Sequence, residues 1–391
     1  MYMQVDRLAA GLLALGLKPG DRVGVWGPNS YEWILSQFAT AKAGMILVSL
    51  NPAYQLKEIE FTLKKVQCKA VICPSSFKTQ RFSQMLQNLC PEIDPSSKNH
   101  FQSSRLPDLR MVIVMDCTEP GMLHFQDAME AGESRHHKEL MDLQSKLTFD
   151  DPINIQFTSF VCVFLFPCIT VWLCAWRHVY GVHGITLVFP CKGYNSQANL
   201  KAIQNERCNI VYGTPTMHTD MLSQRDLHTF DFRQLKEVIY GTTENSPVTF
   251  LGFPLDSDEL KLNTATVVDP VTGVTVPLGA SGELLIRGYC VMLGYWEDEA
   301  KTREAIGKDR WYRTGDIASL NSKGYCAIEG RIKDLIIRGG ENIYQDGQSC
   351  TPEEIQGYCK GQISHFKIPH YVMFIKKVTL KENMEKQLGL Q

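Results

Sequence analysis

The sequence predicts an α/β protein with a large N-terminal domain of parallel sheets and helices. Over the first seventy residues, apolar runs alternate with helix-length amphipathic segments, as in right-handed βαβ units. After Gly279 the pattern changes to short strands separated by glycine turns, which indicates a smaller antiparallel sub-domain. Residues 331–391 are expected to form a truncated α+β C-terminal domain, so two domains are predicted, 1–330 and 331–391.

The apolar spacing predicts each element of the N-terminal part. One helical face carries the apolar residues from Val5 to Leu13, and Gly16 ends that helix. Ser30 can cap a second helix, and a third helix follows it. The inward faces of these two helices are expected to be Ile34, Leu35, Phe38 and Ala41, and then Leu56, Ile59, Leu63 and Val66. Strands are predicted at 23–26, 45–50, 70–73, 111–115 and 153–157.

The rest of the chain has shorter elements. Residues 91–105 are polar and predict a surface loop, and 198–213 predicts a helix followed by a strand. A further strand is predicted at 235–240, and a helix and a strand at 352–360 and 371–375. The antiparallel sub-domain is expected to contain the strands 283–287, 317–320, 325–329 and 335–338.

Composition narrows the class of protein. Apolar residues make up 44% and charged residues 21%, which excludes a disordered chain. The net charge of −2 argues against nucleic-acid binding and against membrane binding through a polybasic segment. The 13 cysteines form no CxxC pair, so neither a disulfide framework nor a four-cysteine zinc site is expected. We expect the protein to occupy a reducing compartment. The opening residues show no secretory or transit-peptide pattern.

Residues 160–176 are apolar and do not fit this pattern. No charge occurs from Pro152 to Trp176, which raises the possibility of a membrane span, for which about 20 apolar residues are needed. Pro167 interrupts the segment, and residues 153–157 already predict a sheet strand. We therefore interpret it as a misjoined segment in an otherwise soluble protein.

Three polar motifs lie next to predicted strands. Tyr240, Gly241, Thr242, Thr243 and Glu244 come directly after a strand, where ligands bind in open α/β sheets. Glycine admits a close ligand, hydroxyls bond phosphate oxygens and a carboxylate holds Mg²⁺. An ordinary strand-to-helix loop with a threonine cap explains these residues equally well.

Asp316 is predicted at the start of a strand, where a carboxylate can accept both hydroxyls of a ribose. A turn aspartate is the alternative. Farther on, charged residues between 330 and 342 are flanked by glycine, which suits a hinge or, more simply, a charged hairpin edge.

The order of these motifs identifies a family resemblance. YGTTE, GELLIRGYCVMLGYW, WYRTGD and GRIKDLIIRGGENIY occur in that order, and together they resemble the adenylate-forming superfamily of acyl-CoA synthetases, luciferases and peptide-synthetase adenylation domains. Residues 212–217 look like its acyl-pocket segment, and 364–369 resemble a segment near its end. The amino-acid sequences of these motifs are most similar to those of the mitochondrial medium-chain fatty-acid ligases. The resemblance covers most of the chain outside residues 160–180 and the final twenty.

The resemblance implies a two-step ligase and a role for each matching residue. A fatty carboxylate attacks the α-phosphate of ATP to give acyl-AMP, and coenzyme A then displaces AMP. By this analogy Thr243 contacts the α-phosphate, Glu244 holds Mg²⁺, and Tyr240 lies along the adenine with the Gly241–Thr242 backbone beside it. Asp316 and Arg331 bind the ribose. Lys333 is the pivot of the C-terminal domain, and Gly339 and Gly340 line the pantetheine tunnel. The location implied is mitochondrial.

Two parts of the family pattern are missing. The family has a Gly-rich loop ending in lysine that wraps the β- and γ-phosphates, but here Phe160 follows Thr158 and Ser159 and no such loop occurs. No Gly-Lys motif occurs near Lys376, Lys377 or Lys381. Several internal segments of the family's chain are also expected to be missing from this sequence.

Three hypotheses follow. The first is a medium-chain fatty-acid:CoA ligase with ATP, Mg²⁺ and coenzyme A as substrates and ion. The second is a catalytically defective variant of such a ligase, produced by splicing or by the gene model, that binds AMP or acyl-CoA at most weakly. The third is a membrane-anchored remnant, which rests only on residues 160–176.

Overall fold

The computed structural model describes most of the N-terminal half and parts of the rest. Described are residues 1–94, 101–148, 150–159, 162–167, 188–211, 215–233, 237–238, 264–288, 291–322, 326–332, 336–338, 341–343, 356–357 and 359–360. The chain divides into two compact units. Unit 1 contains Met1–Thr264 and Ile286–Tyr312, and unit 2 contains Ala265–Leu285 and Arg313–Gln391. The domain boundary expected at residue 330/331 stays a prediction.

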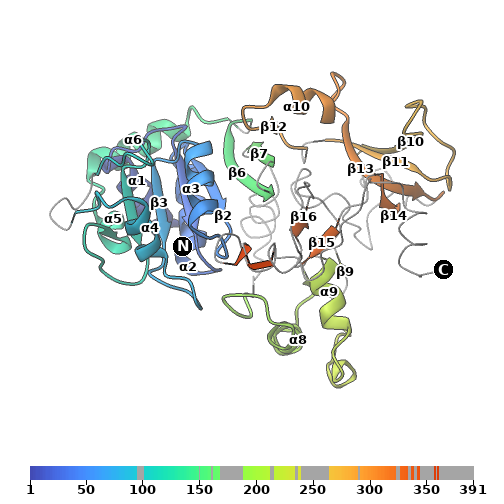
Figure 1. The fold of residues 1–391 in the computed structure, drawn as a ribbon, viewed down its shortest axis with the longest axis horizontal. Helices are drawn as coiled ribbons and strands as arrows, with labels where there is room; N and C mark the ends of the chain where they lie inside the picture. The colour runs from blue at the N-terminus through green and yellow to red at the C-terminus, as the bar shows by residue number, and fades with distance from the viewer. Residues whose placement is uncertain are drawn as a thin grey trace. The chain divides into compact units, whose positions relative to one another are not determined.

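Unit 1 contains a sheet, sheet A, with the strand order β12-β7-β6-β2-β1-β3-β4-β5 (Figure 1). The six strands from β6 to β5 in this order are parallel, which confirms the predicted α/β class. Both pairings of β7, with β6 and with β12, are antiparallel. The strands are β1 (Arg22–Trp26), β2 (Ile46–Leu50), β3 (Ala70–Cys73), β4 (Met111–Val114), β5 (Leu123–His124), β6 (Pro152–Ser159), β7 (Cys162–Pro167) and β12 (Gly294–Tyr295).

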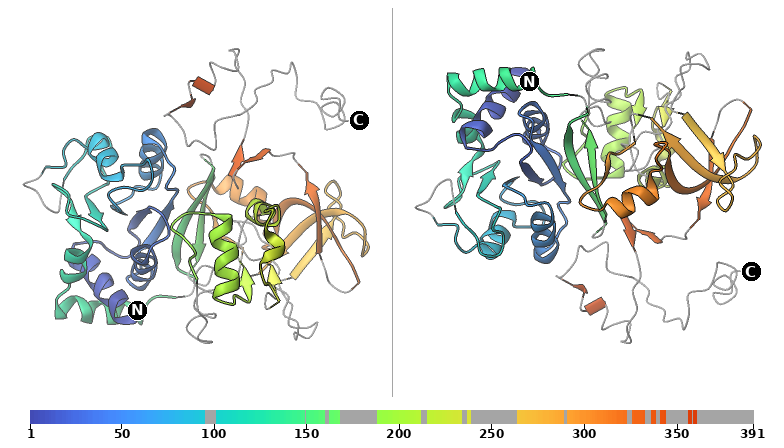
Figure 2. Two further views of the ribbon diagram at one scale, coloured as in Figure 1. Left: turned by 90° about the horizontal axis from the view of Figure 1, so that it is seen from below. Right: turned by 90° about the horizontal axis from the view of Figure 1, so that it is seen from above.

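Helices cover both faces of the parallel part of sheet A, as Figure 2 shows from two sides. Each face has its own buried apolar cluster, because side chains alternate along a strand. One cluster joins the sheet to α1 (Tyr2–Ala14), α2 (Tyr31–Lys42), α5 (Phe125–Glu130) and α6 (Ser134–Gln144). The other joins it to α3 (Leu56–Lys65) and α4 (Phe82–Leu89).

The helix ends in this part of the chain follow their sequence signals. The Ser30 hydroxyl accepts a hydrogen bond from the Trp33 backbone N–H at 3.2 Å, so the predicted cap of α2 is confirmed. Gly16 follows α1 with φ of 86°, a conformation that glycine adopts without strain. The inward position predicted for Leu56 was wrong, since this first residue of α3 is 37% exposed.

The remaining described elements of unit 1 are short. Helix α8 packs against α9, and β8 pairs in parallel with β9. A hydroxyl of Thr302 in α10 connects that helix to β12 through the Tyr295 backbone N–H. The elements are α8 (Ser196–Asn205), β8 (Ile210–Val211), α9 (Pro215–Leu222), η2 (Leu227–Thr229), β9 (Glu237–Val238) and α10 (Glu299–Ala305).

A four-stranded sheet lies mostly in unit 2, with the strand order β10-β11-β13-β14. The predicted antiparallel pairing is confirmed between β13 and β14. A separate antiparallel pair is formed by β15 and β16. The strands are β10 (Thr264–Val268), β11 (Gly282–Arg287), β13 (Tyr312–Leu320), β14 (Cys326–Arg331), β15 (Ile336–Arg338) and β16 (Glu341–Ile343).

The apolar segment 160–176 is described only in part. Its residues 162–167 form β7, a strand of sheet A. Among the described residues, no helix has the length and apolar character needed to cross a membrane. Of the described residues in the helix predicted at 352–360, residues 356, 357 and 359 are helical, and the strand predicted at 371–375 lies outside the described residues.

Candidate active site

Asp316 lies inside a strand and not at its start, which corrects the sequence prediction. Strand β13 begins at Tyr312, and Tyr312, Thr314, Asp316 and Ala318 are the buried positions of its alternating pattern. The prediction was wrong because only the apolar residues after Gly315 gave a strand signal, whereas Arg-Thr-Gly-Asp is typical of a turn. Asp316 is 3% exposed, so the fold places a carboxylate on the buried side of the sheet.

The pairing of β13 with β14 brings Asp316 and Arg331 together. These two residues are register partners across the antiparallel ladder. The Ile332 backbone N–H donates to the Gly315 carbonyl at 2.9 Å, which holds the two strands together beside this pair. The two residues expected to bind a ribose are therefore neighbours on adjacent strands.

Strand β13 is also tied to β11 by side chains. The Thr314 hydroxyl donates to the Leu284 carbonyl at 2.7 Å and accepts from the Asp316 backbone N–H at 3.0 Å. Arg313 donates to Glu283 at 2.9 Å. The Glu283 side chain is only 6% exposed, so this ion pair is screened less than a surface pair. Thr314 belongs to the WYRTGD motif, but nothing in the spacing of that motif indicates the contact between its hydroxyl and β11.

The carboxylates of this sheet affect the pKa of Cys326. It pairs with Leu320 across the β13–β14 ladder. Burial raises the pKa of the Cys326 thiol, and the negative charges of Asp316 and Glu329 raise it further. These negative charges make the thiolate form of Cys326 less favourable.

Most of the other residues expected in the site lie outside the described residues. Tyr240, Gly241, Thr242, Thr243 and Glu244 follow β9, which ends at Val238. Lys333, Gly339 and Gly340 also lie outside the described residues. Arg338 and Glu341, on either side of the two glycines, are register partners in the β15–β16 pair.

Strands β6 and β7 form an antiparallel pair, the β6–β7 hairpin, at the point where the family resemblance implies a phosphate loop. Strand β6 runs to Ser159, which pairs with Cys162 at the start of the antiparallel strand β7. Because β6 lies between β2 and β7, ladder hydrogen bonds engage its backbone on both sides. Backbone N–H groups committed to a ladder cannot also surround a phosphate.

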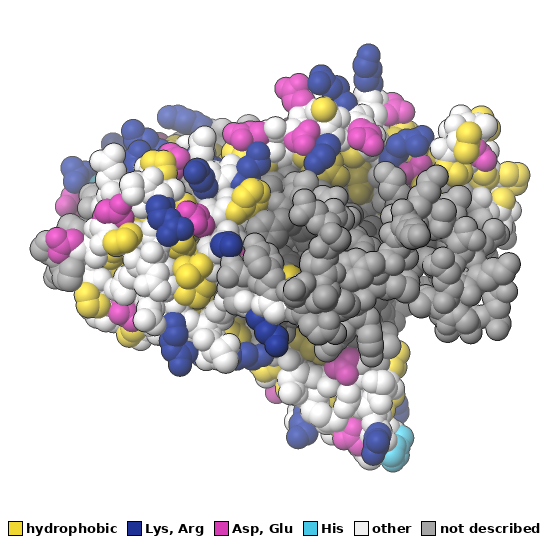
Figure 3. Space-filling view, viewed as in Figure 1, with side chains coloured by type: hydrophobic (Ala, Val, Ile, Leu, Met, Phe, Trp, Pro, Cys, Tyr) yellow, Lys and Arg dark blue, Asp and Glu magenta, His cyan; other side chains and the backbone are white. Residues whose placement is uncertain are grey.

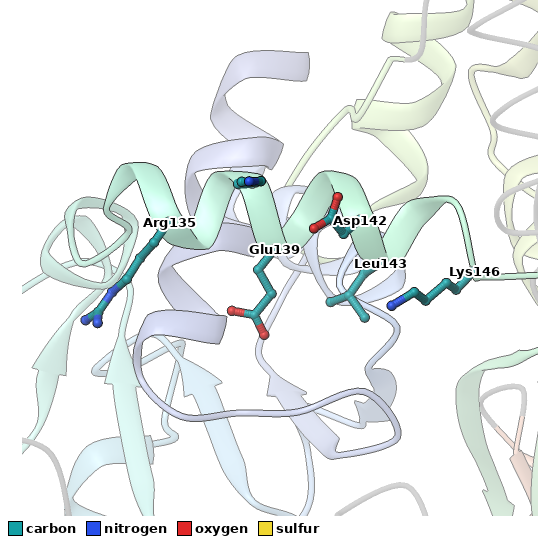
Figure 4. Close-up of a pocket in the computed structure, with 6 residues that line it drawn as sticks. Arg135, Glu139, Asp142, Leu143 and Lys146 are labelled. Carbon is teal, nitrogen blue, oxygen red and sulfur yellow. The ribbon is translucent and has the colours of Figure 1, made fainter.

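A shallow cavity lies along α6 in unit 1. Its lining residues come from this helix and from the turn directly after it, and their side chains spread along this segment (Figure 4): Arg135, Lys138, Glu139, Asp142, Leu143 and Lys146. None of the predicted site residues lines it. On the face shown in Figure 3, basic and acidic side chains are interspersed over the described surface.

Comparison with known proteins defines the class. A family model described as "AMP-binding enzyme" matches residues 1–159 and 231–296. The match stops before the apolar segment and resumes after it. The chain belongs to the AMP-binding enzyme family, and the predicted membership of the adenylate-forming superfamily is confirmed.

Relatives of known name extend this likeness over the whole chain. The chain is 48% identical to "Medium-chain acyl-CoA ligase ACSF2, mitochondrial" of Danio rerio, covering 100% of this chain and 84% of the relative. It is 38% identical to the protein of the same name from Homo sapiens, covering 99% and 83%. The first alignment spans 508 positions, although this chain has only 391 residues, so more than a hundred aligned positions have no counterpart here.

Solved structures share the fold. An amide bond synthetase from Marinactinospora thermotolerans matches with a TM-score of 0.71 at 18% identity, covering 97% of this chain and 91% of that one. A long-chain-fatty-acid-CoA ligase from Archaeoglobus fulgidus matches with a TM-score of 0.66 at 15% identity, covering 93% and 87%. At these identities the likeness supports the fold alone.

Proposed function

We propose that this protein is a medium-chain fatty-acid:CoA ligase, an acid-thiol ligase that activates a fatty carboxylate as its adenylate. The observation that carries the proposal is the 48% identity to a named medium-chain acyl-CoA ligase over the full length of this chain. The substrates are ATP, a medium-chain fatty acid and coenzyme A, and the products are acyl-CoA, AMP and pyrophosphate. The relatives named mitochondrial support a mitochondrial location.

In this proposal Asp316 and Arg331 hold the ribose of the nucleotide. Asp316 accepts hydrogen bonds from the ribose hydroxyls, and Arg331, its register partner on β14, supplies a second polar contact. Their register pairing on adjacent strands supports this role, because a fixed ribose keeps the α-phosphate in position for attack.

The remaining roles come from the family resemblance. Thr243 contacts the α-phosphate, Glu244 holds Mg²⁺, and Tyr240, Gly241 and Thr242 lie beside the base. Lys333 is the pivot between the two half-reactions. Gly339 and Gly340 leave room for the pantetheine arm of coenzyme A.

Product analysis of the full-length protein tests the reaction class. The protein is incubated with ATP, Mg²⁺, coenzyme A and acetate, octanoate or palmitate, and the products are identified by mass spectrometry. We expect octanoyl-CoA, AMP and pyrophosphate in equal amounts, with less thioester from acetate and palmitate. Formation of ADP and phosphate, or absence of thioester from every carboxylate, would overturn the proposal.

Two variants link the activity to the site. Asp316→Asn keeps the shape of the side chain but removes its charge, and we expect it to lower thioester formation strongly. Asp127→Asn makes the same change at an exposed position on α5 and should leave the activity unchanged. Equal activities of the two variants would show that Asp316 is not part of the site.

A further inference from the structure

Thr314 connects Asp316 to the neighbouring strand through a single hydroxyl. The residue is 8% exposed, and its hydroxyl donates to the Leu284 carbonyl of β11 at 2.7 Å. The same oxygen accepts from the Asp316 backbone N–H at 3.0 Å. This hydroxyl therefore satisfies two buried backbone groups at once, one on each strand.

The residue between Thr314 and Asp316 turns the backbone. Gly315 has φ of 71°, a left-handed conformation directly before Asp316 that glycine adopts without strain. The Gly315 carbonyl accepts from Ile332 beyond β14, so the turn is fixed on that side. On the other side, the hydroxyl of Thr314 spans the glycine and ties the Asp316 amide to β11.

We propose that Thr314 is a positioning residue for Asp316, orienting its carboxylate for the two hydroxyls of a ribose. The inference rests on the proposed function, and it adds a residue to which no role has been given. Threonine suits the task because its branched β-carbon restricts χ1 and so fixes the hydroxyl. Valine has nearly the same shape but would remove the hydrogen bonds to the Leu284 carbonyl and from the Asp316 N–H.

Discrimination between ribose and a ribose without hydroxyls tests this role. Calorimetric titration of the full-length protein with AMP and with 2′,3′-dideoxy-AMP gives the affinity ratio of the two nucleotides. We expect the wild type to favour AMP and Thr314→Val to lose about tenfold in AMP affinity, roughly 1.4 kcal/mol, with little change for the dideoxy nucleotide. Thr314→Ser keeps the hydroxyl and should retain most of the preference.

A matched control exists in unit 1. The Thr302 hydroxyl accepts from the Tyr295 N–H at 2.9 Å and donates to the Asp298 carbonyl at 2.7 Å, so it also joins two backbone groups. Thr302→Val makes the same chemical change away from β13. It should lower the melting temperature while leaving the nucleotide preference unchanged.

The outcomes separate the inference from the proposed function. If Asp316→Ala abolishes the preference but Thr314→Val lowers both affinities equally, or only the melting temperature, Thr314 is structural and the inference is wrong. If the wild type and Asp316→Ala both bind the two nucleotides equally, the ribose assignment itself is wrong and the inference falls with it. Collapse of the preference in Thr314→Val, with retention in Thr314→Ser, supports it.

Discussion

Sheet A and the four-stranded sheet of unit 2 bury different kinds of side chain. Strands β3 and β4 of sheet A are buried at every residue, between two apolar clusters. Strand β13 buries only alternate residues, and two of these are Thr314 and Asp316. Apolar burial stabilises the first sheet, whereas in the second sheet hydrogen bonds hold polar groups in place. Sheet A therefore buries mainly apolar side chains, whereas β13 places polar side chains at buried positions.

The largest expected effect concerns catalysis. The β6–β7 hairpin follows the strand after which the family resemblance implies the phosphate loop, and its described residues are paired in a ladder and cannot supply those preorganised donors. Losing one such donor typically costs about 10²–10³ in rate. We therefore expect octanoate-dependent pyrophosphate release to be slower by at least about 10² than for the Danio rerio relative assayed alongside. A rate within tenfold of that relative would mean that other residues replace the loop.

Removal of a core side chain from unit 1 should have the next largest effect. Phe82 is 0% exposed and packs edge-on against Trp26, with ring centroids 4.6 Å apart. Phe82→Ala should lower the free energy of unfolding by about 3–5 kcal/mol, because it leaves a cavity. Urea unfolding followed by tryptophan fluorescence measures the loss.

Phe61 provides the control for this core substitution. It lies on α3 with 40% of its surface exposed, so Phe61→Ala should cost well under half as much. Equal losses for the two variants would show that burial in the apolar cluster does not determine the stability of this part.

A helix cap should have a smaller effect. Ser30→Ala removes the acceptor for the Trp33 N–H and should cost about 1 kcal/mol in the same unfolding experiment. Ser134→Ala, at the exposed first residue of α6, is the matched control and should change little. If Ser30→Ala is as stable as Ser134→Ala, the cap contributes nothing to the fold.

The smallest effect is expected on the connection between β10 and β11 in unit 2. Val271 is 91% exposed, so Val271→Ser should change the free energy of unfolding by less than about 0.5 kcal/mol. A larger loss would show that this side chain has a partner in the folded protein, and the contrast with Phe82 would then be weaker.

The same contrast explains what the sequence could predict. The strand 70–73 and the cap at Ser30 were predicted correctly, because apolar runs and capping residues act locally. The start of β13 was missed, because polar residues occupy its buried positions. The opposition of Asp316 and Arg331 depends on the register of two strands, which no local pattern fixes. The role proposed for Thr314 depends on the hydrogen bond from its hydroxyl to the carbonyl of Leu284, thirty residues away in the sequence.

Titration of the full-length protein with AMP and with ATP tests the central claim most directly. We expect AMP to bind at least as tightly as ATP, because Asp316 and Arg331 are register partners in unit 2, whereas the described residues of β6 and β7 are paired in a ladder and form no cradle for the β- and γ-phosphates. Calorimetry in Mg²⁺ buffer measures both affinities. If ATP binds about tenfold more tightly than AMP, a difference of roughly 1.4 kcal/mol, the triphosphate is held after all and the account is contradicted.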